Sequence, residues 1–146
     1  MRNACFALLL LLLAGCEPPA TATGNAALLE SLRGQWVVIN YWAKWCKPCI
    51  QEIPELNELD HLHDDITVLG VNYDGATGEE LATQLQELNV AFPTLGEDPA
   101  ELLGQPRPSV LPTTLIINPE GELVHSLVGP QTLESLLAAT RGTQQQ

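Results

Sequence analysis

The chain has 146 residues, of which 18 are Asp or Glu and 6 are Lys or Arg, giving a formal net charge of −12. This length suits one domain. The strong negative charge argues against nucleic acid as a ligand and against a basic patch that binds anionic lipid.

The first residues are typical of a targeting signal. Arg2 is followed by an almost wholly apolar run at residues 4–13, which is too short to span a bilayer and indicates a signal-peptide core. The run ends in the sequence LAGC, whose cysteine is Cys16, and this ending resembles the lipobox of bacterial lipoproteins. The resemblance implies that residues 1–15 are removed and that Cys16 carries a lipid. An ordinary secretory peptide is the alternative.

Removal of the signal changes the cysteine count. Cys5 would leave with the signal and Cys16 would carry lipid, so that Cys46 and Cys49 remain as free thiols. A single pair in an oxidising compartment indicates redox chemistry rather than a scaffold held by disulfides. Residues 16–25 are expected to form a lipid-anchored tether, residues 26–141 the domain, and residues 142–146 a flexible tail.

The domain pattern alternates between strands and helices. In chain order it first predicts a short helix at 27–32, a buried strand at 36–42, a helix at 49–61 that Pro54 kinks, and a second buried strand at 66–71. A helix opened by a capping box at 77–80 and a short extended segment at 92–95 follow. The last elements are a hairpin of strands at 113–117 and 122–128 and a closing helix around Leu133, Leu136 and Leu137. The first half predicts parallel strands with crossovers, and the hairpin adds an antiparallel edge. A three-layer α/β sandwich follows.

The strand at 36–42 leads directly into the sequence Cys46-Lys47-Pro48-Cys49 and then into a helix. A thiol at a helix N-terminus faces unpaired backbone N–H groups and the positive end of the helix dipole, and both favour the nucleophilic thiolate. Lys47 adds a positive charge, and Pro48 fits the first turn, where its missing N–H costs nothing. Cys49 lies on the same helical face as Cys46 and can close a disulfide with it.

Other uses of this cysteine pair are weaker. A zinc site lacks a second cysteine pair after processing, and the histidines lack finger-like spacing. A covalent haem site would need histidine where Ile50 stands. A structural disulfide across two residues restrains little chain. A non-enzymatic, copper-handling protein stays open as an alternative and would need His125 to approach the thiols. No metal or organic cofactor is expected.

The stretch VVINYWAKWCKPC resembles the active-site strand and helix start of the thioredoxin superfamily. With Pro54, VLGVNYD, VAFPTL and VLPTTLIINPEGELV, it makes residues 34–137 similar to the TlpA/ResA-like, membrane-tethered thioredoxins of bacterial envelopes. The resemblance implies a thioredoxin-like three-layer α/β/α sandwich with a mixed central sheet. It also implies a cis bond before Pro112, next to which the backbone pairs with an extended substrate segment. A trans proline at a strand start is the alternative.

The resemblance also assigns roles around the thiols. Thioredoxins keep a buried aspartate six residues before the first cysteine, where this chain has Asn40. Glu52 matches a glutamate that lies near the thiols in the ResA-like subgroup, and it could relay the proton of Cys49. A solvated helix residue is the alternative for Glu52. The substrate-docking surface is expected to comprise Trp45, Lys47, Pro48, Leu111 and Pro112.

The implied function is that of an envelope protein-disulfide reductase. It would be anchored at Cys16, face the periplasm and act as a monomer. It would reduce exported proteins such as apocytochrome c through Cys46 and Cys49, and a DsbD/CcdA-like membrane protein would supply its electrons. A disulfide-donating oxidase or isomerase is the alternative. A peroxidase of the peroxiredoxin type is rejected, because Ala43 and Ile39 stand where that class needs Thr or Ser and Pro.

Overall fold

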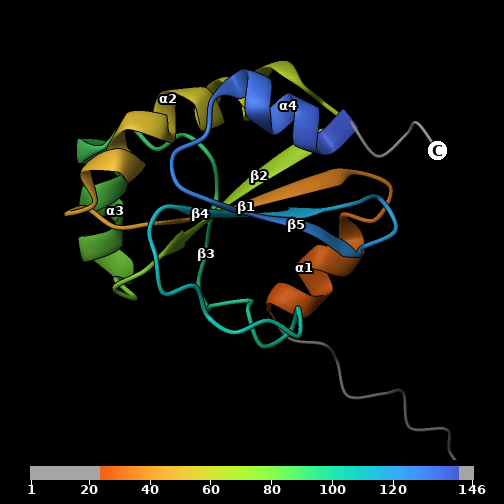
Figure 1. The fold of residues 1–146 in the computed structure, drawn as a ribbon. Coiled ribbons are helices and arrows are strands. Elements are labelled where there is room, and N and C mark those ends of the chain that lie inside the picture. Colours follow the sequence, from red (N-terminus) through yellow and green to blue (C-terminus); the bar gives the residue numbers. More distant parts are fainter. Residues whose placement is uncertain (1–23, 142–146) are drawn as a thin grey trace, which may run out of the picture.

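The computed structural model describes residues 24–141 as a five-stranded sheet with helices on both faces (Figure 1). The predicted signal peptide, most of the tether with Cys16, and the tail lie outside the described residues. The elements are α1 (Asn25–Ser31), β1 (Trp36–Trp42), α2 (Lys47–Leu62), β2 (Ile66–Asn72), α3 (Gly78–Glu87), β3 (Thr94–Leu95), β4 (Thr113–Ile117), β5 (Leu123–Val128) and α4 (Leu133–Arg141).

The sheet is mixed, with the strand order β3-β2-β1-β4-β5. The pairs β1–β2 and β2–β3 are parallel, whereas β4 is antiparallel to both β1 and β5. The predicted combination of parallel crossovers and an antiparallel hairpin is therefore confirmed, as is the three-layer sandwich. The hairpin contains an irregularity in register between Ile116 and Ile117.

Strand β1 lies in the middle of the sheet, and all seven of its residues are buried. Its alternating side chains enter two separate cores, as the period of two in a strand requires. One face packs against α2 and α4, which Figure 1 shows on the same side of the sheet. The other face packs against Leu29 of α1 and against Leu32, the C-cap of that helix. The strand therefore holds the residues that follow it in a fixed place at the carboxyl edge of the sheet.

Helix α2 begins at Lys47, two residues earlier than predicted, because Cys46 serves as its N-cap. The Cys46 sulfur accepts the backbone N–H of Cys49 at 3.3 Å. Pro48 occupies the first turn, as expected, and Pro54 lies inside the helix without ending it. Helix α1 also begins earlier than predicted, at Asn25, whose side chain donates to the Glu97 carbonyl at 2.7 Å.

The predicted capping box of α3 is wrong. Thr77 is the N-cap, but its side chain makes no capping hydrogen bond. Gly78 has a φ of 56°, which departs from helical geometry at the first position, and the Glu80 carboxylate accepts from Gln84 at 3.2 Å instead of reaching back to the cap. A reciprocal cap is found at α4, where the Thr132 and Ser135 side chains accept each other's backbone N–H.

Helix α3 uses leucines on one side to cover the carboxyl end of β1. Leu81, Leu85 and Leu88 pack against the cluster that contains Trp42. Within residues 24–141, no helix combines the length and apolar character needed to cross a membrane.

Candidate active site

Cys46 and Cys49 lie at the N-terminus of α2, directly beyond the carboxyl end of β1. They are joined by a disulfide, with a distance of 5.3 Å between their Cα atoms. Cys46 is 4% exposed and Cys49 is fully buried. Only the first sulfur is therefore placed for attack on another molecule, while the second reaches the first from within the protein.

The helix start supplies the electrostatics that thiolate chemistry needs. The N–H of Cys49 already points at the Cys46 sulfur at 3.3 Å, and the unpaired amides of the first turn place partial positive charge there. Lys47 and Pro48, which lie between the two cysteines, are both exposed. They are free to contact a partner, as the docking hypothesis for these residues requires.

The segment before β4 forms the other wall of the site. The peptide bond between Leu111 and Pro112 is cis, as predicted from the resemblance. Leu111 packs against the cluster formed by Trp42, Ala43, Cys46 and Cys49. The chain order separates these residues by more than sixty positions, and the antiparallel pairing of β4 with β1 brings them together.

Trp45 stands beside the cysteines with 63% of its surface exposed. Its indole N–H donates to the Asp74 carboxylate, with a distance of 2.9 Å to Oδ2. Asp74 follows β2, whose end lies beside the end of β1. This hydrogen bond fixes the orientation of the exposed ring, so Trp45 offers a preset apolar surface. The role of Asp74 was not predicted from the sequence, because the pairing of β1 with β2 decides which loops meet.

Glu52 is only 1% exposed, so the alternative of a solvated helix residue is wrong. Its Oε1 accepts from the Asn40 amide at 2.6 Å, and its Oε2 accepts from the Gln131 backbone N–H at 2.9 Å. Burial raises the pKa of Glu52 to about 7, while the hydrogen bonds from Gln131 and Asn40 oppose that rise. The carboxyl group therefore exchanges protons near neutral pH, one turn of α2 beyond Cys49.

A polar cluster that the sequence did not reveal holds the loop before Pro112. The Asp98 carboxylate accepts from the Tyr41 hydroxyl at 2.6 Å and from Arg107 Nε at 2.8 Å. The Arg107 guanidinium lies 3.9 Å from the centre of the Tyr73 ring and also donates to the Tyr73 carbonyl. Burial raises the pKa of Tyr41 above its ordinary value, so its hydroxyl stays a donor. These contacts attach the loop to the ends of β1 and β2.

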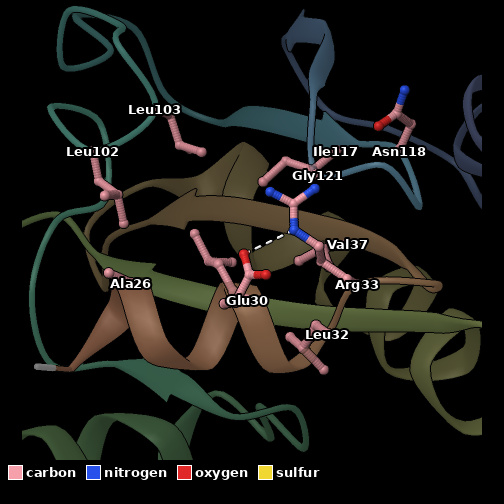
Figure 2. Close-up of a pocket in the computed structure, with 11 residues that line it drawn as sticks. Ala26, Glu30, Leu32, Arg33, Val37, Leu102, Leu103, Ile117, Asn118 and Gly121 are labelled. Carbon is pink, nitrogen blue, oxygen red and sulfur yellow. Dashed lines mark hydrogen bonds and ion pairs between the residues drawn. The ribbon is translucent and has the colours of Figure 1, made fainter. Parts of the chain in front are cut away.

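A hollow in the described residues lies away from the cysteines. It has a volume of about 360 Å³ and lies between α1, the start of β1 and the turn joining β4 to β5. Figure 2 shows Arg33 and Glu30 paired at its edge, with the apolar side chains Leu102, Leu103 and Ile117 around it. Val37 in its wall lies near the start of β1, whereas Cys46 lies beyond the carboxyl end of that strand. The hollow is thus separate from the redox site.

Among residues 24–141, no group of three or more His, Cys, Asp or Glu side chains is arranged to hold a metal ion. The copper-handling alternative required His125 beside the two thiols. His125 instead lies in β5, where it pairs with Ile116. The described part of the chain therefore offers that alternative no ligand set beyond the two cysteines.

Known proteins match both the fold and the sequence. The crystal structure of StoA from Bacillus subtilis has a TM-score of 0.59 at 24% identity and covers 73% of this chain and 83% of its own. A putative thiol:disulfide interchange protein DsbE from Chlorobium tepidum has a TM-score of 0.61 at 27% identity and covers 76% of this chain and 84% of its own. The fold and the cysteine pair thus define a thioredoxin-fold protein with a disulfide at the redox position.

The family is also shown directly. The model of the AhpC/TSA family matches residues 15–126, and the chain belongs to this family. Among curated relatives, thiol-disulfide oxidoreductase ResA of Bacillus cereus is 31% identical over 77% of this chain. ResA of Bacillus subtilis is 32% identical over 78% of this chain. The chain spans 66% and 64% of the length of these two relatives.

Proposed function

We propose that this protein is a thiol–disulfide oxidoreductase that reduces disulfides of exported proteins through Cys46 and Cys49. The observation that carries the proposal is the disulfide at the start of α2, in which Cys46 keeps 4% exposure and Cys49 is fully buried. Its relatives among curated proteins are named thiol-disulfide oxidoreductases, which supports the same chemistry. Ala43 is fully buried and carries no hydroxyl, which agrees with the rejection of a peroxiredoxin-type peroxidase.

The reaction is a two-step exchange. The Cys46 thiolate attacks one sulfur of a substrate disulfide, so a Cys46–substrate bond forms while the substrate S–S bond breaks and one substrate thiolate leaves. The Cys49 thiolate then attacks the Cys46 sulfur. The Cys46–Cys49 disulfide forms, the mixed disulfide breaks and the second substrate thiolate leaves. Two electrons have passed from the protein to the substrate.

Glu52 takes the proton that Cys49 must lose before the second step. Three residues along a helix correspond to a rise of about 4.5 Å, so the carboxyl group lies one turn beyond the buried thiol. A carboxylate whose pKa is about 7 accepts a proton readily at neutral pH and returns it readily. The leaving substrate thiolates take up protons from solvent.

The location, substrates and electron donor that we propose rest on the sequence and on the likeness to relatives. The protein is proposed to be anchored by lipid at Cys16 and to face the periplasm as a monomer. Exported proteins such as apocytochrome c are its proposed substrates, and a membrane protein of the DsbD/CcdA type restores the dithiol. These proposals are supported by the lipobox-like LAGC sequence and by the likeness to the ResA-like proteins.

Trapping of the mixed disulfide tests the proposal. Cys49→Ala leaves Cys46 free to attack but removes the second step, so covalent complexes should accumulate in the native envelope and disappear on treatment with dithiothreitol. Cys46→Ala is the matched control and should trap nothing. The absence of complexes with Cys49→Ala would contradict the mechanism.

The direction of the exchange needs a second measurement. A redox titration of the pair against glutathione gives its reduction potential. A potential well below that of the glutathione couple supports a reductase, whereas a potential near that of strong oxidants supports the oxidase or isomerase alternative.

A further inference from the structure

Asn40 lies fully buried in the middle of β1, between Glu52 and Thr114. Its Nδ2 donates to Oε1 of Glu52 at 2.6 Å and to Oγ1 of Thr114 at 3.0 Å. Its own carbonyl oxygen, Oδ1, is buried and has no hydrogen-bond partner among residues 24–141. A buried acceptor without a donor destabilises the folded state, so this arrangement needs a physical explanation.

We propose that Asn40 is a positioning residue that keeps Glu52 hydrogen-bonded in both of its protonation states by turning its amide group. When Glu52 is ionised, Nδ2 donates to the carboxylate, as the structure shows. When Glu52 holds a proton, the amide turns over, and Oδ1 accepts the O–H of the acid. The unused oxygen of the first arrangement is the acceptor that the second arrangement requires.

The contact with Thr114 survives the turn. A hydroxyl both donates and accepts, so Thr114 Oγ1 accepts from Nδ2 in the first arrangement and donates to Oδ1 in the second. Asn40 therefore keeps two hydrogen bonds in either state. A leucine in its place would offer none, and an aspartate would place a second negative charge beside Glu52.

The other side of Glu52 determines where its proton resides. Oε2 accepts from the backbone N–H of Gln131 at 2.9 Å. A backbone N–H can only donate a hydrogen bond. If Oε2 carried the proton, its O–H group and the Gln131 N–H would be two donors facing each other, which is unfavourable. The proton is therefore held on Oε1, which is the oxygen that Asn40 contacts.

Both states of Glu52 are populated under ordinary conditions, since burial raises its pKa to about 7. The other ionisable groups of the elements that pack on this side of the sheet are Cys46, the N-cap of α2, then Lys47, Cys49, Glu55, Glu58, Asp60 and His61 of α2, Glu134 and Arg141 of α4, and His125 of β5. The Glu55 carboxylate is occupied by the backbone N–H of Leu133 at 2.8 Å. Strands β1 and β4 carry only Tyr41, which packs in the core on the opposite face.

The inference rests on the proposed function only in its use for the proton of Cys49, and a titration of the oxidised full-length protein tests it separately. Labelled with ¹³C and ¹⁵N, the protein reports the Glu52 carboxyl carbon and the Asn40 side-chain amide by NMR as pH changes. We expect both sets of signals to move with one midpoint. In Glu52→Gln, the pH dependence of the Asn40 signals should disappear.

Asn72 provides an internal control. It is a buried asparagine of the neighbouring strand β2, whose amide donates to Gln84 Oε1 at 2.8 Å and whose oxygen accepts the Ala76 N–H at 3.0 Å. It contacts no carboxyl group, so its signals should not follow the Glu52 midpoint. Asn40 signals that stay constant while Glu52 titrates would overturn the proposal.

Two variants separate the effect of the Asn40 amide group on the Glu52 midpoint from a general effect of core packing. Asn40→Leu removes a charged hydrogen bond from the ionised form of Glu52 and a weaker neutral one from the protonated form. The midpoint of Glu52 should therefore rise by about one pH unit, which is the difference between the two. Thr114→Val removes one hydrogen bond from each arrangement and should leave the midpoint almost unchanged. If Asn40→Leu fails to fold, the wild-type titration still decides.

The oxidised protein has no thiol at Cys46 or Cys49, so this titration is independent of disulfide exchange. Normal exchange kinetics in Glu52→Gln would contradict the proposed proton acceptor and leave the amide result intact. Joint titration of Asn40 and Glu52 supports the inference whatever those kinetics show.

Discussion

The two cysteines differ in what they can reach, although the sequence presents them as a symmetrical pair. Cys46 retains 4% exposure as the N-cap of α2, whereas Cys49 is fully enclosed under the helix start. Their order in the reaction therefore follows from access as well as from the helix terminus, which stabilises negative charge on the first sulfur.

The reduced protein should show this asymmetry directly. We expect iodoacetamide to alkylate Cys46 well before Cys49, because Cys46 alone of the pair keeps some exposure and lies at the positive end of the helix. Peptide mass spectrometry after short exposures measures the two rates. Equal rates, or faster modification of Cys49, would mean that the two cysteines have the opposite roles.

Glu52→Gln should slow the step in which Cys49 resolves the mixed disulfide, while the first attack by Cys46 stays unchanged. General acid–base help of this kind is worth roughly a hundredfold. The loss should be greatest near neutral pH and shrink in alkaline solution, where Cys49 ionises unaided. Stopped-flow rates across pH measure it, with the exposed Glu58→Gln on the same helix as the control.

The same variant has a stability signature. The pKa of Glu52 is raised from 4.5 to about 7 in the folded state. Between these values the folded protein binds more protons than the unfolded chain, so its stability falls as pH rises through that window. The difference is roughly 3 kcal/mol at 1.36 kcal/mol per pKa unit. Urea unfolding of the oxidised protein should show this fall in wild type and lack it in Glu52→Gln, and parallel curves would contradict the assignment.

At the scale of single elements, close packing between β2 and β3 requires a glycine. A Cβ atom at Gly70 would lie 2.9 Å from both Trp42 Nε1 and Thr94 Oγ1, and 3.1 Å from the Phe92 ring. Because these atoms belong to packed side chains around a short edge strand, an added methyl group has no room.

Gly70→Ala should therefore destabilise the protein by about 1–3 kcal/mol, as overpacking of a core usually does. The midpoint of denaturant unfolding measures the effect. Gly96→Ala is the matched control next to β3, since a Cβ there meets nothing within 4 Å. Equal midpoints for the two variants would show that β3 moves aside at little cost.

At the scale of the whole molecule, the loop before Pro112 depends on residues from distant parts of the chain. Arg107 bridges Asp98 and the Tyr73 carbonyl, and Tyr41 of the central strand holds Asp98. These contacts hold the loop that carries Leu111, and Leu111 packs against the cluster that contains the two cysteines.

Arg107→Gln should loosen this loop more than it destabilises the fold. The Arg107–Asp98 pair is partly exposed, so its loss should change the free energy of unfolding by about 1 kcal/mol or less. Hydrogen exchange of residues 98–111 should become faster. Arg33→Gln, which removes an exposed ion pair with Glu30 in α1, is the control. Unchanged exchange in the loop would show that packing alone holds it.

The proposed attachment to the membrane concerns the whole chain and rests on Cys16, which lies outside the described residues. Cys16→Ser should abolish lipidation and release the protein from washed membranes, because several acyl chains at one residue are needed for stable anchoring. Fractionation and the mass of the mature N-terminus measure this. Unchanged membrane association with no acyl mass would contradict the lipobox interpretation.

The sequence by itself determined the local features. The apolar run WVVINYW predicted β1 at its observed bounds, and the spacing of Cys46 and Cys49 after it predicted a redox pair at a helix start. The cis bond before Pro112 was predicted by family resemblance alone. The strand and the helix start depend on neighbours in the chain, so propensity and spacing were enough to predict them. The prediction of a capping box at α3 was wrong because Gly78 adopts a positive φ. Glycine permits this conformation but does not require it, so the residue type alone does not predict it.

Only the tertiary structure decided which distant groups meet. Whether Glu52 is buried or solvated depends on α4 and β1 covering one face of α2, and Asn40, Thr114 and Gln131 come from three other segments. The attachment of Arg107 and the hydrogen bond from Trp45 to Asp74 arise in the same way. The order and pairing of the strands determine these contacts. The sequence of one helix or strand does not show which other element it will pack against. The proton chemistry of the site is therefore a property of the fold, whereas the sulfur chemistry is already visible in the chain.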